Sequence, residues 1–195
     1  VLFMQGGAST QFAMIPMNFL QGDKLGSYVI TGSWAKKAAQ EAELAGGMHV
    51  AAQLEQFTRI PDLNEIEPSE RAAYLHVTSN ETIEGIQYKQ FPDSSSVPLI
   101  ADMSSDIMSR PLDLTQFGMI YAGAQKNLGP SGVTLVIIRE DLLNDIPKQV
   151  PTMLRYDTHA SKNSLYNTPP VYSIYMMNLV MGWIQEQGGL AAIER

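Results

Sequence analysis

The sequence predicts an α/β fold, a three-layer α/β/α arrangement around a mostly parallel seven-stranded sheet. Seven short apolar runs recur along the 195 residues, with helix-forming stretches between several of them. Several runs are continuous rather than alternating, as expected for strands that are covered on both faces. The expected strands are 1–4, 28–31, 48–53, 73–78, 97–102, 119–122 and 133–138.

The segments between these runs predict the helices and turns. Residues 10–20 and 33–45 are helix-forming, the first interrupted by Pro16 and the second ended by two glycines. A longer helix is expected over 171–187, and a short serine loop at 94–96. The segment 127–132 is too short for a crossover helix. We therefore expect the last strand to run antiparallel to the strand before it.

Composition indicates one globular domain, with 45% apolar and 17% charged residues. The formal net charge of −7 disfavours nucleic acid and anionic membranes as partners. There is no cysteine, no signal peptide and no membrane-spanning run, so we expect a cytoplasmic protein. The chain starts inside an apparent strand and stops inside an apparent helix, so we expect a fragment of a longer protein.

Lys126 is the only charged residue between Asp113 and Arg139. It follows an expected buried strand and has small and apolar neighbours. Burying an unpaired ammonium is costly, and a lysine escapes this cost by a shifted pKa or by forming a covalent bond. Schiff-base chemistry requires such an amine, so Lys126 is a candidate catalytic residue.

Other candidate residues follow other expected strands, where α/β sheets bind ligands. Asp102 could form a turn with Ser104 and Ser105, or it could pair with the ring nitrogen of pyridoxal phosphate (PLP) and keep that nitrogen protonated. Trp34 could be a core residue or could stack on a planar cofactor. Thr82 could be a helix cap or could contact a ring oxygen.

Gly6 and Gly7 lie between the first expected strand and the first expected helix. Glycines allow a ligand to approach the backbone closely, and the N–H groups at a helix start suit a phosphate. Two glycines before a helix are also a common turn. The surrounding sequence is neither a Walker loop nor a G-x-G-x-x-G fingerprint.

Two further patterns favour structural roles. The three histidines, His49, His76 and His159, do not have metal-ligand spacing, and we interpret them as structural. The expected last helix carries a stripe of Met and aromatic residues, which we interpret as core or dimer packing. The stripe consists of Tyr172, Tyr175, Met176, Leu179, Val180 and Trp183.

Taken together, these segments resemble the phosphoserine aminotransferase family, which belongs to the fold-type-I PLP enzymes. The matching runs are spread in order over nearly the whole chain, at 6–12, 32–34, 79–82, 100–105, 109–111, 120–130 and 164–170. The most specific are Ala-Gly-Ala-Gln-Lys-Asn at 122–127 and Tyr-Asn-Thr-Pro-Pro at 166–170.

The resemblance implies a role for four residues around the cofactor ring. Lys126 would be the lysine that holds PLP as a Schiff base and carries the proton of the 1,3-shift. Asp102 would pair with the pyridine nitrogen. Trp34 would stack on the ring, and Thr82 would contact the phenolic oxygen.

The resemblance also implies which residues hold the phosphate. Ala8, Ser9 and Gln125 would contact it from the same chain. Some family members carry an arginine where this chain has Ser9, so backbone N–H groups would carry more of the binding here. Asn167 and Thr168 would reach the phosphate of the neighbouring subunit's cofactor, and the active form would be a homodimer.

By this resemblance, residues 1–195 would be the PLP-binding large domain of an enzyme of serine biosynthesis. It would interconvert phosphoserine and 3-phosphohydroxypyruvate with glutamate and 2-oxoglutarate. The substrate-gripping basic residues of the family would lie largely outside this chain. The alternatives are another fold-type-I enzyme, such as a desulfurase, lyase or different transaminase, and a dimerising, PLP-binding but inactive module. A sheet protein without a cofactor would leave Lys126 unexplained.

Overall fold

A computed structural model describes residues 1–93 and 96–195, so two serines of the expected loop at 94–96 lie outside the described residues. Seven strands form one sheet in the order β1-β9-β8-β7-β4-β2-β3. They are β1 (Leu2–Met4), β2 (Leu25–Ile30), β3 (Met48–Gln53), β4 (Ala72–Thr78), β7 (Leu99–Asp102), β8 (Met119–Gly123) and β9 (Thr134–Ile138). Each lies where a strand was expected, so the predicted α/β fold is confirmed.

β9 pairs antiparallel with both of its neighbours, β1 and β8, whereas the other strand pairs of this sheet are parallel. The predicted antiparallel last strand is therefore confirmed. A short hairpin of β5 (Asn80–Glu81) and β6 (Ile86–Gln87), which the sequence did not predict, follows β4. This hairpin belongs to the edge of the sheet where the parallel strands end.

The helices are α1 (Gly7–Phe19), α2 (Ser33–Ala45), α3 (Tyr156–Ser161), α4 (Val171–Glu186) and α5 (Leu190–Ile193). The predicted helix at 33–45 is confirmed at both ends. The predicted last helix, 171–187, is confirmed as α4, which ends one residue earlier. The expected interruption at Pro16 is wrong, because α1 continues through it. Pro16 is buried, and we attribute the continuity to the packing of α1 on the sheet and on α2, which offsets the missing N–H. The short helices α3 and α5 were not predicted.

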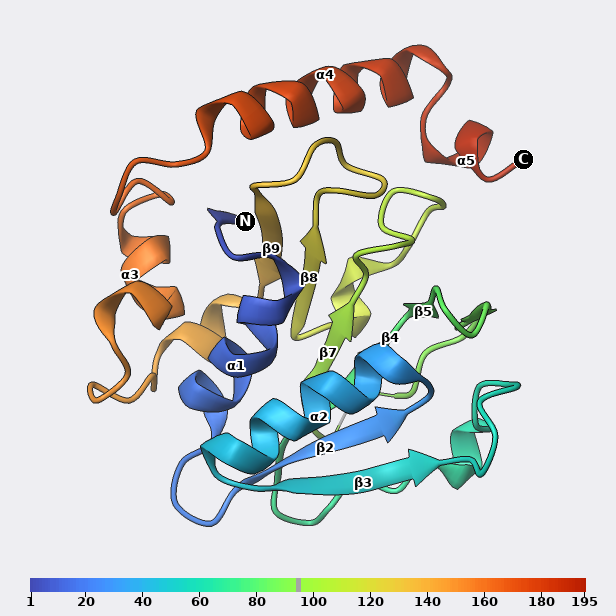
Figure 1. Ribbon diagram of the computed structural model, residues 1–195, viewed down its shortest axis with the longest axis vertical. Helices are drawn as coiled ribbons and strands as arrows, with labels where there is room; N and C mark the ends of the chain where they lie inside the picture. Colours follow the sequence, from blue (N-terminus) through green and yellow to red (C-terminus); the bar gives the residue numbers. More distant parts are fainter. Residues whose placement is uncertain (94–95) are drawn as a thin grey trace.

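α1 and α2 cover one face of the sheet, as Figure 1 shows. Small residues of α2, among them Ala38 and Ala42, are buried there and let the helix lie close to the strands. Buried tyrosines of the strands, such as Tyr28, Tyr74 and Tyr121, fill this side of the core. The carboxyl ends of the parallel strands lie next to the start of both helices.

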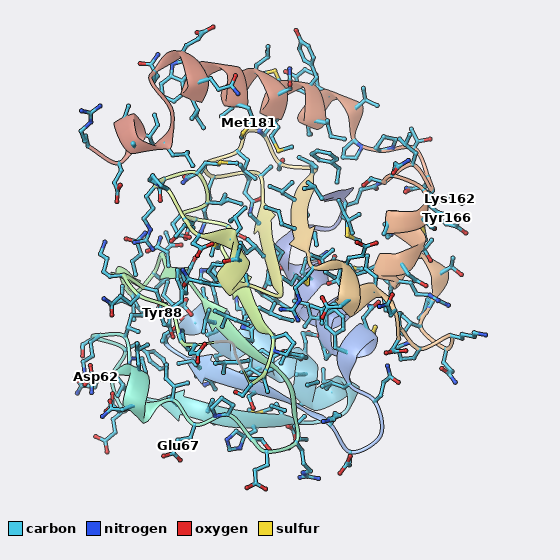
Figure 2. The ribbon with its side chains drawn as sticks, turned by 180° about the vertical axis from the view of Figure 1, so that it is seen from behind. Asp62, Glu67, Tyr88, Lys162, Tyr166 and Met181 are labelled. Carbon is cyan, nitrogen blue, oxygen red and sulfur yellow. The ribbon has the colours of Figure 1, made fainter. Side chains whose placement is uncertain are left out.

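The opposite face is covered mainly by connecting segments, and α4 runs across the sheet end beyond the turn between β8 and β9, as Figure 1 shows. Met177 and Met181 of α4 pack against this second cluster, and Figure 2 shows Met181 pointing from α4 toward the sheet. Gly129, in the turn after β8, lies against the α4 backbone, where an added Cβ would be 3.6 Å from the backbone of Met177. A Cβ at that distance would be in ordinary van der Waals contact, so Gly129 marks where the turn after β8 meets α4.

The Met and aromatic stripe of α4 does not form core in this chain. Tyr172 is 70% exposed and Trp183 is 52% exposed, because the helix packs through Ile174, Met177 and Met181 instead. α4 is apolar on both sides, so periodicity alone did not identify the packed side. Of the two interpretations of the stripe, core packing is wrong, and dimer packing stays a prediction. Among the helices of residues 1–93 and 96–195, none combines the length and hydrophobicity of a bilayer-spanning segment.

Leu99→Ala tests the core of the central strand β7. Leu99 is fully buried, and the lost methyl groups and the remaining cavity are expected to lower the free energy of unfolding by about 2–5 kcal/mol. Urea unfolding followed by circular dichroism measures this change. Leu44→Ala is the control, because Leu44 is 82% exposed and its loss should change stability by less than about 0.5 kcal/mol. Equal effects of the two substitutions would contradict the packing described here.

Candidate functional site

A pocket of about 140 Å³ lies at the carboxyl ends of the parallel strands, beside the first turns of α1 and α2. Most of the residues singled out in the sequence line it: Ala8, Ser9, Trp34, Thr82, Asp102, Gln125 and Lys126. Gly7, Thr78, Asn80, Ser104 and Ser105 complete the lining. Residues from five separate parts of the chain are therefore brought together by the parallel sheet.

Lys126 lies in the turn after β8, at the mouth of this pocket. Its Nζ donates a hydrogen bond to Thr82 Oγ1 at 2.7 Å and lies 5.8 Å from the centre of the Trp34 ring. Its side chain is exposed in this chain, although its sequence neighbours are small and apolar. Ala124 and Leu128 are buried, whereas the three residues of the turn between them are exposed.

Asp102 is the last residue of β7 and is only 5% exposed. Its Oδ1 accepts hydrogen bonds from Ser104 N at 2.9 Å and from Ser104 Oγ at 2.7 Å. Burial raises the pKa of Asp102, while the hydrogen bonds from Ser104 and the charge of Lys126 act in the opposite direction. Asp102 therefore forms the expected turn with Ser104 and also lines the pocket.

Ser104 connects two walls of the site. Its Oγ donates to Asp102 and accepts a hydrogen bond from the N–H of Gly123 at 3.0 Å. Gly123 ends β8, and an added Cβ there would be 2.5 Å from Gln125 Oε1. The carboxylate on β7 is thus linked to the start of the turn that carries Gln125 and Lys126.

The N-terminus of α1 is open. Gly6, in the left-handed region at φ 89°, precedes the helix, and neither a side-chain cap nor an acidic residue occupies the first turn. The first N–H groups of a helix have no intrahelical partner, so those of Gly7, Ala8 and Ser9 can bind a ligand. An added Cβ at Gly6 would overlap with Thr10 Oγ1. This end of the pocket suits an anion.

The N-terminus of α2 is closed by two carboxylates from the β5–β6 hairpin. Glu81 Oε1 accepts from Ala35 N at 2.8 Å and Glu81 Oε2 from Trp34 N at 3.1 Å. Glu84 Oε1 accepts from Ser33 N at 2.8 Å and from Ser33 Oγ at 2.7 Å. Sequence reasoning missed this contact, because no local pattern links residues 46 or more positions apart.

Glu81 is completely buried next to other acidic groups. Burial raises its pKa to about 7, together with smaller contributions from Glu84 and Asp102, and against the hydrogen bonds from Ala35 and Trp34. Two residues that line the pocket, Thr78 and Trp34, each carry a buried polar side-chain atom, Thr78 Oγ1 and Trp34 Nε1. Neither has a hydrogen-bond partner within residues 1–93 and 96–195.

Asn167 and Thr168 do not line the pocket of their own chain. Asn167 borders a separate hollow together with Gly6 and Thr10, and the backbone oxygen of Thr168 accepts a hydrogen bond from Gln5 Nε2 at 3.2 Å. Both residues therefore lie near the segment that precedes α1, outside the group of residues around Lys126.

The histidines lie apart from this pocket's lining. His76 is completely buried, its Nε2 is 2.8 Å from Tyr121 Oη, and burial lowers its pKa to about 3, so the ring is neutral. His49 and His159 each contact a backbone oxygen. In the part of the chain that the structure describes, no three His, Asp or Glu residues are grouped so that they could hold a metal ion.

Comparison with known proteins gives the family. The chain matches the aminotransferase class-V family over residues 1–195. It belongs to this family. The family member from Niallia circulans, a phosphoserine aminotransferase, is 64% identical over all of this chain and 54% of its own length. The phosphoserine aminotransferase of Herpetosiphon aurantiacus is 60% identical over 99% of this chain and 54% of its own length.

Solved structures agree with this assignment. Phosphoserine aminotransferase from Bacillus circulans subsp. alkalophilus superimposes with a TM-score of 0.97 at 65% identity, over 99% of this chain and 54% of that one. PLP-bound phosphoserine aminotransferase from Trichomonas vaginalis superimposes with a TM-score of 0.92 at 40% identity, over 99% of this chain and 55% of that one. The resemblance to phosphoserine aminotransferases is confirmed, and the chain spans about half the length of these relatives.

Glu81→Gln tests the raised pKa of Glu81. The folded-state pKa of about 7 lies above the ordinary glutamate pKa of 4.5, so between these values the folded protein holds a proton that the unfolded chain releases. The free energy of unfolding of the wild type should therefore fall as pH rises from about 4.5 to 7, and the variant should lack this contribution. Urea unfolding at several pH values measures the difference. Glu43→Gln, at an exposed position of α2, should leave the wild-type profile unchanged. Parallel profiles for the wild type and Glu81→Gln would contradict the shift.

Proposed function

We propose that residues 1–195 form the PLP-binding large domain of a phosphoserine aminotransferase. The enzyme interconverts phosphoserine and 3-phosphohydroxypyruvate with glutamate and 2-oxoglutarate, a reaction of serine biosynthesis. One observation carries the proposal: Lys126, Asp102 and the open N-terminus of α1 meet at a single pocket. The phosphoserine aminotransferases at 60–64% identity support this choice of reaction within the class-V family.

The pocket fits PLP in its charges and in its unused polar groups. The N–H groups of α1 suit the phosphate, and the buried carboxylate of Asp102 suits a protonated ring nitrogen. Thr78 lines the same pocket, and its buried Oγ1 has no partner in the described residues. When bound, PLP supplies an electron sink for charge that develops on the substrate's α-carbon.

We propose Lys126 as the catalytic residue of the chain. With PLP bound, the Lys126 amine would hold the cofactor at its aldehyde carbon, and when free it would carry a proton between the substrate α-carbon and C4′ of the cofactor. Thr82 accepts the 2.7 Å hydrogen bond from Nζ, and in this proposal it would also contact the phenolic oxygen. Asp102 would keep the ring nitrogen protonated, and Trp34 would stack on the ring.

Phosphate binding rests on the backbone in this proposal. Ala8 and Ser9 present N–H groups at the open start of α1, and Gln125 approaches from the turn after β8. Since Ser9 carries no charge, the helix dipole and these N–H groups provide the attraction that an arginine would otherwise add.

The complete site is proposed to need a second copy of the chain. Asn167 and Thr168 lie outside the pocket of their own chain, which is consistent with contact to the phosphate in a neighbouring subunit. The exposed aromatic face of α4, with Tyr172 and Trp183, is available for such packing. A homodimer in the cytoplasm that binds phosphorylated amino and keto acids, without nucleic acid or membrane partners, is therefore part of the proposal.

A second candidate function applies to residues 1–195 alone. In this candidate, residues 1–195 would be a PLP-binding, dimerising module that does not turn over substrate by itself. This candidate shares the cofactor site with the first one and differs only in catalysis.

Borohydride trapping tests the role of Lys126. Purified protein mixed with PLP should absorb visible light, and borohydride should fix the cofactor covalently on the peptide that contains Lys126, as measured by mass spectrometry. Lys126→Ala should abolish this labelling. Lys37→Ala is the matched control, because Lys37 Nζ lies 4.5 Å from the Trp34 ring but the residue is outside the pocket lining. A colourless wild-type protein that takes up no PLP would overturn the cofactor proposal.

Turnover tests the proposed reaction in the longer protein that contains this chain. Phosphoserine and 2-oxoglutarate should yield glutamate, and Lys126→Ala should reduce the rate by at least about 10³-fold, because proton transfer by a positioned group contributes about 10²–10⁴-fold and the amine also binds the cofactor. A coupled glutamate assay measures the rate, and gel filtration checks that the dimer persists. Residual turnover near the wild-type rate would refute the role of Lys126.

A further inference from the structure

Two pocket residues with proposed contacts to the cofactor ring come from different segments. Trp34 is in the first turn of α2, and Thr82 lies in the hairpin after β4. A single side chain joins them. Glu81 is covalently adjacent to Thr82, and its carboxylate accepts hydrogen bonds from the backbone N–H groups of Trp34 and Ala35 at 3.1 and 2.8 Å.

The contact between the hairpin and α2 is tight. An added Cβ at Gly32 would be 2.6 Å from Glu81 Cδ and 2.7 Å from Glu84 Cδ, so the glycine leaves room for both carboxyl groups. Glu81 is completely buried and both of its carboxyl oxygens are used. Glu81 is not among the residues that line the pocket, so its effect on the site must pass through the residues that it holds.

The two helices that begin at the pocket edge differ in whether their first N–H groups have partners. The start of α1 has no side-chain cap, whereas the first three N–H groups of α2, on Ser33, Trp34 and Ala35, all donate to carboxylates of the hairpin. Only the α1 end is left for the ligand's phosphate. The indole Nε1 of Trp34 has no partner in the described residues, so the ring is held by its backbone anchor, by packing against the hydrophobic core and by the lysines Lys37 and Lys126 near its face.

We propose that Glu81 is a positioning residue for the cofactor: by joining the backbone of Trp34 to the segment that carries Thr82, it fixes the stacking ring relative to the Lys126–Thr82 pair. This inference rests on the proposed function. Loss of the two hydrogen bonds lets the first turn of α2 move relative to Thr82, so PLP remains bound through Lys126 and α1 but is stacked less well.

The test compares Glu81→Gln with Glu84→Gln in a Trp183→Phe background, where Trp34 is the only tryptophan. Both substitutions remove a capping carboxylate from α2, but only Glu81 contacts the N–H of Trp34. PLP is titrated into each protein, and three quantities are measured: the Kd, the visible circular dichroism of bound PLP and the quenching of Trp34 emission. Thermal unfolding confirms that each variant is folded.

Glu81→Gln is expected to weaken PLP binding about tenfold, within the range set by loss of a helix cap, and to reduce both the dichroism band and the quenching. Glu84→Gln should change the Kd by less than about threefold and leave both optical signals near wild type. Equal signals for Glu81→Gln and the wild type, or equal losses in the two variants, would overturn the inference.

Two further outcomes are distinguishable. If Glu81→Gln does not fold, Glu81→Asp replaces it, since the shorter carboxylate cannot reach both N–H groups. An intermediate loss of quenching then supports the inference, and wild-type behaviour overturns it. If the wild type itself binds no PLP, the proposed function fails, whereas normal binding by the wild type and by Glu81→Gln refutes only the positioning role.

Discussion

The parallel pairing of β4, β7 and β8 is the constraint on which the rest of the site depends. Thr78 lies opposite Asp102, and Asp102 lies opposite Tyr121, so three strands end at nearly the same level. Neighbouring strands are about 4.8 Å apart, which places residues distant in sequence within the reach of one small ligand. The turns that follow these strands then carry Thr82, Ser104 and Lys126 to the same edge.

The charges of the site are arranged around this edge. Asp102 and Glu81 are buried carboxylates, and each is balanced locally, Asp102 by Ser104 and Lys126 and Glu81 by the N–H groups of α2. The N-terminus of α1 is the remaining positive end. The pocket is thus polarised, with an anion-binding end at α1 and a cation-binding end at Asp102. This polarity matches a cofactor that carries a phosphate and a protonated ring nitrogen.

Much of the fold could be predicted because its signals are local. Continuous apolar runs marked the strands, and Gly46 marked the end of α2. The site could be predicted in part, since the strand-end rule singled out Asp102, Lys126 and Trp34 before their contacts were known. The sequence-based predictions that were wrong concerned which side chains are buried and which are exposed. Lys126 has apolar neighbours in sequence but lies in an exposed turn, and the stripe of α4 faces away from the core because the opposite side of the helix is equally apolar.

The strand and helix order, the antiparallel last strand and the residue types available for cofactor chemistry could all be read from the sequence, because each follows from a short-range pattern or from a motif. Which helix N-terminus stays open depends on contacts made in the folded chain. Glu81 and Glu84 close α2 from a hairpin about 50 residues away in sequence, and no local rule connects them. The exposure of Lys126, its bond to Thr82 and the raised pKa of Glu81 likewise depend on burial and long-range contacts, which arise only when the sheet has assembled.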